Sequence, residues 1–252
     1  MNHKIVILSA VSLIIAAALG FFFVDFVLKG NLWSLLWALI IGIIYLSLLF
    51  IKTTIIKPAW DDLLSITIDV IVISAFFWGN YNIWLWLAAL ITIIGLWSAT
   101  SFVQSIVNNV VKIRLFELSR HFFRPAFLAL SFFVVAVYLS FINPELLVIP
   151  IEPIRYLVDL TAQTTPVKLP MPPEDLADFI YRRLNQTLAN LPFQAKVSFL
   201  VLAGLIVLSV INSFSFIVSW VGFVISWLIF RLLLAIKFVT IKTQKVEKEL
   251  IT

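Results

Sequence analysis

Residues 32–51 read LWSLLWALIIGIIYLSLLFI, a run of twenty residues without a charged side chain. A helix of this length is roughly 30 Å long, which matches the hydrocarbon core of a lipid bilayer. Similar runs recur along the 252-residue chain, which is 62% hydrophobic and only 12% charged. Soluble domains carry about 25% charged residues. The sequence therefore predicts an integral membrane protein.

The apolar runs predict helices rather than strands. A membrane β-barrel would show short segments in which apolar and polar residues alternate, whereas these runs are apolar on every side. Backbone groups inside lipid must pair within their own segment, as they do in a helix. We therefore expect an all-α bundle of six or seven transmembrane helices.

Five of these helices are expected within residues 1–143. The spans are Ile5–Leu28, Leu32–Ile51, Leu63–Trp78, Ile83–Val103 and a fifth that Pro125 opens and that ends near Asn143. Span four is expected to continue as a basic helix that carries Lys112, Arg114, Arg120 and Arg124.

Residues 144–195 differ from the rest, since they contain eight of the ten prolines and form the one extramembrane segment of any size. Pro173, Glu174 and Asp175 predict the start of a helix. The apolar stripe that follows predicts an amphipathic helix that Pro192 ends; its members are Leu176, Phe179, Ile180, Leu184, Leu188 and Leu191.

The last apolar run, Val197–Phe238 within residues 196–240, allows two interpretations. As one helix its 42 residues would be roughly 63 Å long, about twice the hydrocarbon core. Length therefore favours a hairpin that turns near Asn212 and Ser213, giving seven spans. Charge favours six spans, because 12 of the 18 Lys and Arg residues then lie on one side, against a split of 11 and 7 with seven spans.

The six-span arrangement places the N-terminus and the basic, polar tail (residues 241–252) together on the cytoplasmic side, and we expect a bacterial inner membrane.

Asp69 is the main candidate for a functional residue, because an uncompensated carboxylate inside a membrane costs a few kcal/mol. Four-residue spacing groups it with Ser65 and Asp61. A polar face on span four could meet this group in a cleft that binds a cation or proton; its members include Ser101, Gln104, Ser105 and Asn108. The alternative is that Asp69 is neutral or hydrogen-bonded and locks helix packing.

A seam of small and polar residues runs through the last apolar region: Asn212, Ser215, Ser219, Gly222 and Ser226. Small residues at heptad spacing let helices approach closely. The seam predicts packing against another helix, or alternatively the lining of a homo-oligomeric pore.

Several chemistries do not fit this sequence. The chain has no cysteine and only two histidines, both outside the spans, so thiolate sites, a bis-histidine haem and a zinc-protease helix are excluded. No phosphate-binding glycine loop is present, and the net charge of +5 lies in loops and tail. We expect no enzyme activity, cofactor, metal or nucleic-acid partner.

Two functions remain open. The first is a small channel or transport protein that acts through Asp69 or through the seam. The second is a scaffold or accessory subunit of a larger membrane complex. Either would have the lipid bilayer as its surroundings, and copies of itself or other membrane subunits as partners.

Overall fold

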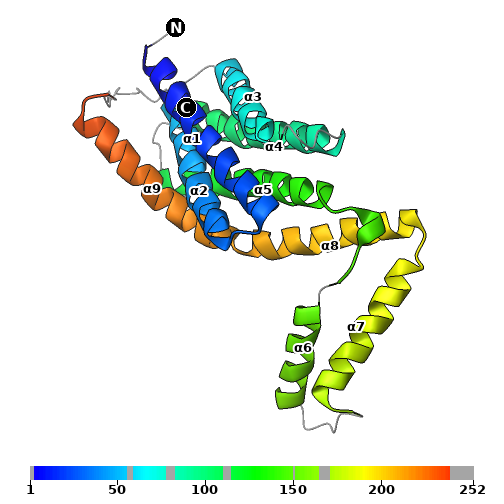
Figure 1. Ribbon diagram of the computed structural model, residues 1–252. Helices are drawn as coiled ribbons and strands as arrows, with labels where there is room; N and C mark the ends of the chain where they lie inside the picture. The colour runs from blue at the N-terminus through cyan, green and yellow to red at the C-terminus, as the bar shows by residue number, and fades with distance from the viewer. Residues whose placement is uncertain are drawn as a thin grey trace, which may run out of the picture. The chain divides into compact units, whose positions relative to one another are not determined.

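The structure is a computed structural model that describes residues 3–55, 59–77, 83–109, 115–149, 151–164 and 171–238. In these ranges it is helical and has no strand, which confirms the all-α fold class (Figure 1). The helices are α1 (His3–Lys29), α2 (Leu32–Ile55), α3 (Ala59–Ala75), α4 (Ile83–Asn109), α5 (Leu115–Ser140), the 3-10 helix η2 (Pro144–Leu146), α6 (Ile151–Thr164), α7 (Pro173–Ala189), α8 (Phe193–Ser213) and α9 (Ser215–Ala235).

Six of the described helices are long and apolar enough to cross a membrane, namely α1, α2, α4, α5, α8 and α9. The predicted third span corresponds to α3, which has only 17 described residues and carries three aspartates.

The chain divides into two units, of which the first comprises Met1–Tyr138 with Val207–Thr252 and the second comprises Leu139–Ile206.

The first two helices form an antiparallel hairpin with a tight connection. Gly30 has a φ of 65° and ends α1 with a hydrogen bond of 2.8 Å from its N–H to the Phe26 carbonyl. Glycine suits this position because it lacks a Cβ. The Asn31 side chain then accepts a hydrogen bond of 3.1 Å from the backbone N–H of Trp33 and starts α2.

Contacts between the helices fix their directions. Ser12 meets Asp69 and Phe23 meets Phe77, so α3 runs parallel to α1. Gln104 at the end of α4 meets Asp62 at the start of α3, so this pair is antiparallel. Phe102 of α4 lies beside His121 of α5 and Thr92 beside Ala129, so α5 again reverses direction.

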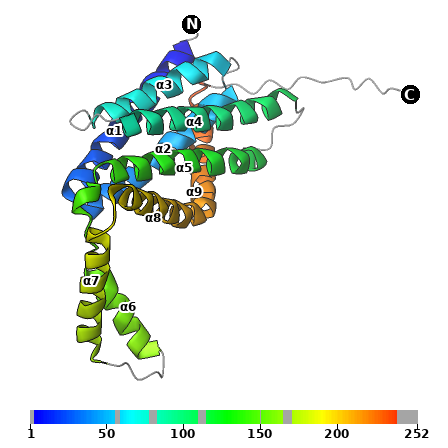
Figure 2. The same ribbon diagram turned by 90° about the vertical axis from the view of Figure 1, so that its right-hand side faces the viewer.

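We call one end of this bundle the Lys52 end. It is the end at which α1, α3 and α5 begin and at which α2 and α4 end. Figures 1 and 2 show these helices from two sides.

The fifth helix differs from its prediction. It begins at Leu115 and contains Pro125 in its interior, so Pro125 does not open it, and Arg120 and Arg124 belong to α5 rather than to an extension of α4. A proline inside a helix removes one backbone hydrogen bond. Buried side chains on both sides of the proline, among them Phe122, Phe123, Ala126 and Phe127, continue the helix across it.

The last apolar run forms two helices that are separated by one residue, Phe214. Phe214 keeps helical dihedral angles (φ −82°, ψ −2°), and hydrogen bonds continue through it from the Phe214 N–H to Ile211 and from the Val218 N–H to Phe214. Antiparallel helices need a loop of about 2–5 residues outside the helical conformation. The chain therefore bends at Phe214 without the reversal that a hairpin requires.

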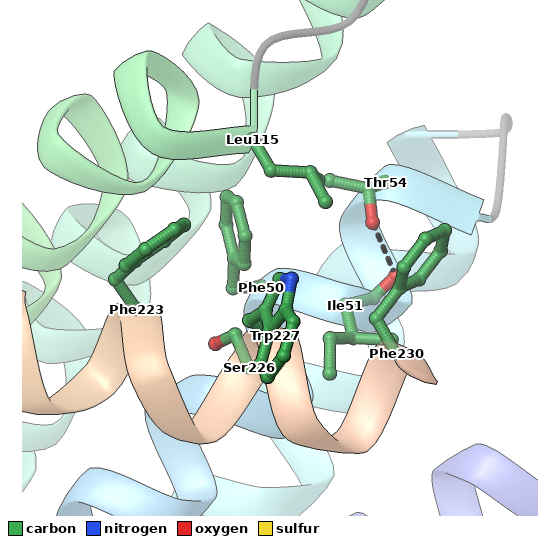
Figure 3. A pocket seen from close by; sticks show the side chains of 8 residues that line it. All are labelled: Phe50, Ile51, Thr54, Leu115, Phe223, Ser226, Trp227 and Phe230. Atoms are coloured by element: carbon green, nitrogen blue, oxygen red, sulfur yellow. Dashed lines mark hydrogen bonds between the residues drawn. The ribbon is translucent and has the colours of Figure 1, made fainter. Parts of the chain in front are cut away.

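Helix α9 runs parallel to α2. The Ser47 hydroxyl donates to the Gly222 carbonyl at 3.3 Å, and further along both helices a cavity of about 10 Å³ separates their side chains (Figure 3). Its lining comprises Phe50, Ile51, Thr54, Leu115, Phe223, Ser226, Trp227 and Phe230. The last turn of α9 therefore lies at the Lys52 end; the predicted tail, residues 241–252, is outside the described residues.

The second unit contains a hairpin of α6 and α7. Helix α7 begins at Pro173, where the sequence predicts an amphipathic helix. Its apolar face packs on α6 around Ile154, Val158 and Ala177, and Asn185 forms two hydrogen bonds with the backbone of Ile149. The sequence pattern does not anticipate α6, because the prolines of this region suggest an irregular loop; Pro153 occupies the first turn, where a helix tolerates proline.

We predict that Gly222→Ala lowers the free energy of unfolding by about 1–3 kcal/mol, the usual cost of overpacking. A Cβ at Gly222 would lie 2.4 Å from the ring of the buried Phe123. Gly42→Ala is the matched control, since its Cβ would meet Leu130 at an ordinary 3.5 Å. Unfolding of both variants in one detergent by added SDS measures the difference, and equal stabilities would contradict the packing of α9 on this bundle.

Candidate functional site

The candidate site lies inside a group of four helices. Helices α1 and α4 each pack against both α2 and α3. The helices α2 and α3 therefore face each other across the interior of this group. Side chains that are two helical turns apart point to the same side of a helix. Each of these two helices directs one such pair inward: Tyr45 and Lys52 from α2, and Asp62 and Asp69 from α3.

All three charged side chains of this group are buried. Lys52, Asp62 and Asp69 are each 1% exposed, and Tyr45 is fully covered. We call these four residues, together with Ser12 and Gln104, the Lys52 cluster. Charged side chains are almost never buried to this degree without partners, so the cluster is the most unusual feature of the described bundle.

Two hydrogen bonds hold the carboxylates in place. The Ser12 hydroxyl of α1 donates to Asp69 Oδ2 at 2.6 Å. The Gln104 amide of α4 donates to Asp62 Oδ2 at 2.5 Å. Each aspartate is thus tied to a different neighbouring helix, and the cluster links all four helices.

Other polar atoms of the cluster have no hydrogen bond. They are Lys52 Nζ, Asp62 Oδ1 and the Tyr45 hydroxyl. A buried polar atom without a hydrogen bond costs about 1–3 kcal/mol, and a charged one costs more. Such atoms need a specific explanation in a native structure.

The charges of the cluster do not balance. Two carboxylates face one ammonium group, so with every group ionised the buried cluster carries one excess negative charge. One proton or one monovalent cation would neutralise it. Oxygen atoms of carboxylates and of a phenol are chemically suited to either.

The residues predicted from the sequence have different positions in the structure. Asp69 and Gln104 belong to the cluster, but they contact Ser12 and Asp62 rather than each other. Ser65 is buried on α3, whereas Asp61 is exposed. Of the span-four residues, Ser101 is half-buried, Ser105 is exposed and donates to the Phe102 carbonyl, and the Asn108 side chain lies outside the described part.

The sequence analysis missed Ser12, Tyr45, Lys52 and Asp62. The predicted second span ends at Ile51, because the apolar run ends just before Lys52, but α2 continues to Ile55. One available signal is the pair of seven-residue spacings, Tyr45 to Lys52 and Asp62 to Asp69. Seven residues are nearly two whole turns, which keeps both members on one side of the helix.

The small-residue seam lies mainly against the chain's own bundle. Ser219, Gly222 and Ser226 are buried on α9, and Gly222 contacts Ser47 and Phe123. Ser215 is half-buried, whereas Asn212 belongs to α8 and is exposed. The three buried members therefore serve helix packing within this bundle.

A second charged group lies at the opposite end of the bundle. Lys29 forms an ion pair of 2.6 Å with Asp25, which also accepts a hydrogen bond from Ser34. The Lys29 side chain is 74% exposed, so this pair is a surface feature of the turn between α1 and α2. Among the described residues, no group of three or more His, Cys, Asp or Glu could hold a metal ion.

We predict that Lys52→Met lowers the free energy of unfolding by about 3–5 kcal/mol at neutral pH, because it leaves two buried carboxylates without a cation. The loss should be smaller at pH 5 than at pH 8, since protonation of either carboxylate relieves it. The double variant Lys52→Met with Asp62→Asn should recover part of the loss. SDS-induced unfolding in detergent micelles measures all three effects.

Lys29→Met is the matched control, since it removes an exposed ammonium from a surface pair. It should leave the stability unchanged. Equal losses for Lys29→Met and Lys52→Met would show that Lys52 is not a buried charge.

Comparisons with protein-family models, with curated proteins and with solved structures found no match to this chain. The site therefore has to be interpreted from its own geometry and chemistry.

Proposed function

We propose that the chain is an integral membrane transport protein of a bacterial inner membrane, and that the Lys52 cluster binds the proton or small monovalent cation that it moves. The observation that supports this function is the burial of Lys52, Asp62 and Asp69, two carboxyl groups and one amine, with polar atoms that lack a hydrogen bond. Ionisable groups inside a membrane protein are costly and mark ion or proton pathways.

A purely structural role fits the cluster less well. Polar residues that only lock helices together tend to satisfy each other's hydrogen bonds. Here Lys52 Nζ and Asp62 Oδ1 are both buried and both lack one. Replacement of a buried group of charges by apolar residues of similar volume is often neutral or stabilising, so the presence of these charges favours a role that requires them.

The cluster extends from one end of the bundle toward its middle. Lys52 lies one turn before the end of α2, and Asp62 lies in the first turns of α3. Asp69 is seven residues further along α3, which is roughly 10 Å deeper. We propose that the ion enters from the Lys52 end past Asp62 and reaches Asp69 and Tyr45.

The direction of α9 supports an orientation with both termini in the cytoplasm. The last turn of α9 lies at the same end as the start of α1. This arrangement corresponds to the six-span interpretation, which gathers 12 of the 18 Lys and Arg residues on one side. An excess of positive charge marks the cytoplasmic side of a membrane protein.

A scaffold or accessory subunit is the second candidate function, and the second unit favours it. The α6–α7 hairpin has its own apolar core, yet leaves Tyr156, Leu157 and Phe179 exposed. Purification in a mild detergent would bring down stoichiometric partners of a scaffold.

We predict that purified protein in liposomes conducts protons or Na⁺, and that Asp69→Asn and Asp62→Asn each lower this flux at least about tenfold, because an amide can neither exchange a proton nor supply charge. A pH-sensitive dye measures proton flux under an imposed potassium diffusion potential. A Na⁺-sensitive dye measures the flux in a sodium gradient.

Asp61→Asn is the matched control, because it removes the same charge from an exposed position next to Asp62. Its flux should equal that of the unchanged protein. Absence of any H⁺, Na⁺ or K⁺ flux, or equal loss in Asp61→Asn and Asp62→Asn, would refute the proposed function.

We also predict the sidedness of three cysteine variants in sealed vesicles. Lys57→Cys and Thr243→Cys should react with an impermeant maleimide from one side, and Asn31→Cys from the other, since α2 and α9 end at the same end of the bundle. The chain has no cysteine of its own, so no background labelling arises. Labelling of Thr243→Cys together with Asn31→Cys would refute the six-span orientation.

A further inference from the structure

The oxygen atoms that remain open in the Lys52 cluster indicate which ion it can bind. Hard metal cations are held in proteins by about six oxygen ligands, whereas a proton forms a bond to a single atom. Among the described residues, the buried oxygen atoms of the cluster without a hydrogen bond are Asp62 Oδ1 and the Tyr45 hydroxyl. Backbone carbonyls inside a helix already accept helix hydrogen bonds. Two open oxygen atoms suffice for a proton and are too few for the ligand shell of a metal cation.

The two hydrogen-bond donors of the cluster also favour a proton. Ser12 donates to Asp69 Oδ2 at 2.6 Å, and Gln104 donates to Asp62 Oδ2 at 2.5 Å. Each donor directs a hydrogen atom at a carboxylate oxygen, and a metal cation needs the lone pairs of such oxygens for itself. One oxygen of each aspartate is therefore already engaged, and Asp62 is left with Oδ1.

Lys52 adds a positive charge that a metal cation would have to approach. Its Nζ is buried with the two aspartates and has no hydrogen bond. An ammonium group has three donors and no lone pair, so it repels a metal cation and cannot bind one. A proton avoids this conflict, because its transfer from an ammonium to a carboxylate leaves both groups neutral.

We propose that the ion of the Lys52 cluster is the proton and not a metal cation, and that Asp62 Oδ1 is the atom that accepts it. This proposal rests on the function proposed above and names its substrate. An O–H bond forms at Oδ1 when the proton arrives from the Lys52 end. The same bond breaks when the proton moves on to the Asp69 carboxylate, which returns Asp62 to its ionised form and consumes no other group.

Transport in three salts tests the choice of ion. Liposomes that contain the purified protein receive a pH gradient, a membrane-permeant anion balances the charge, and an internal dye reports the proton flux. This flux should be equal in choline, sodium and potassium salts, because no metal cation takes part. Radioactive sodium should enter no faster than it enters liposomes without protein. Asp62→Glu should retain more proton flux than Asp62→Asn, because it restores a carboxyl group.

Infrared spectroscopy provides a readout that needs no transport. Lowering the pH of the unchanged protein produces the carbonyl bands of protonated carboxyl groups, and the band that Asp62→Asn removes belongs to Asp62. Asp61→Asn, at the exposed neighbouring position, should keep this band. The pH at which the band appears should be equal in choline and sodium salts. Sodium bound at the same carboxylate would compete with the proton and shift that pH.

The groups around Asp62 are the same in both salts, so they do not imitate such a shift. They are the titratable Lys52 and Tyr45 of α2, Asp61 and Asp69 of α3, and the uncharged Ser12 of α1 and Gln104 of α4.

The possible outcomes separate this proposal from the function on which it rests. A proton flux that requires sodium or potassium, or an Asp62 band that shifts with sodium, would overturn the proton as the ion and leave transport in place. Infrared bands that Asp62→Asn does not change at any pH would overturn Asp62 as the acceptor. Absence of proton, sodium and potassium flux would instead refute the transport function.

Discussion

Many hydroxyl groups in the described helices form hydrogen bonds within their own helix, and the rest of the structure depends on this constraint. Ser47, Thr53 and Thr92 donate to the carbonyls four residues before them, at 2.8 Å each. Hydroxyl groups can use such bonds in a helix, whereas charged side chains cannot. Some polar side chains therefore find a hydrogen-bond partner within their own helix, and others need a partner on another helix. Lys52, Asp62 and Asp69 belong to the second kind.

The ends of a helix could be predicted well where the length and composition of its apolar run determine them. They were predicted less well where packing against other helices determines them. The apolar runs predict α1, α2 and α4 closely, because length and composition suffice there. The sequence analysis ends the second span at Ile51, since a lysine normally leaves the membrane, but the structure buries Lys52 among acids of another helix. Likewise, Pro125 lies inside α5 because aromatic packing on both sides outweighs one lost hydrogen bond.

The site was predicted in part, and helix geometry explains the remainder. Spacing in steps of four residues groups Asp69 with Ser65 and Asp61, but eight residues rotate the helix about 80° beyond two full turns. Seven residues fall only about 20° short of two turns. Asp62 therefore points to the interior with Asp69, while Asp61 points outward. The positions of α2 and α3 on opposite sides of the four-helix interior depend on how all four helices pack. The residue pattern of one helix does not contain that information.

The last apolar run shows how one contact decides the topology. Its two halves have similar lengths and hydrophobicity, so neither property distinguishes them. Packing does, since Ser219, Gly222 and Ser226 of the second half are buried and let α9 approach Ser47 and Phe123 closely. This approach sets α9 parallel to α2. The shared direction of the two helices places the last turn of α9 at the Lys52 end of the bundle.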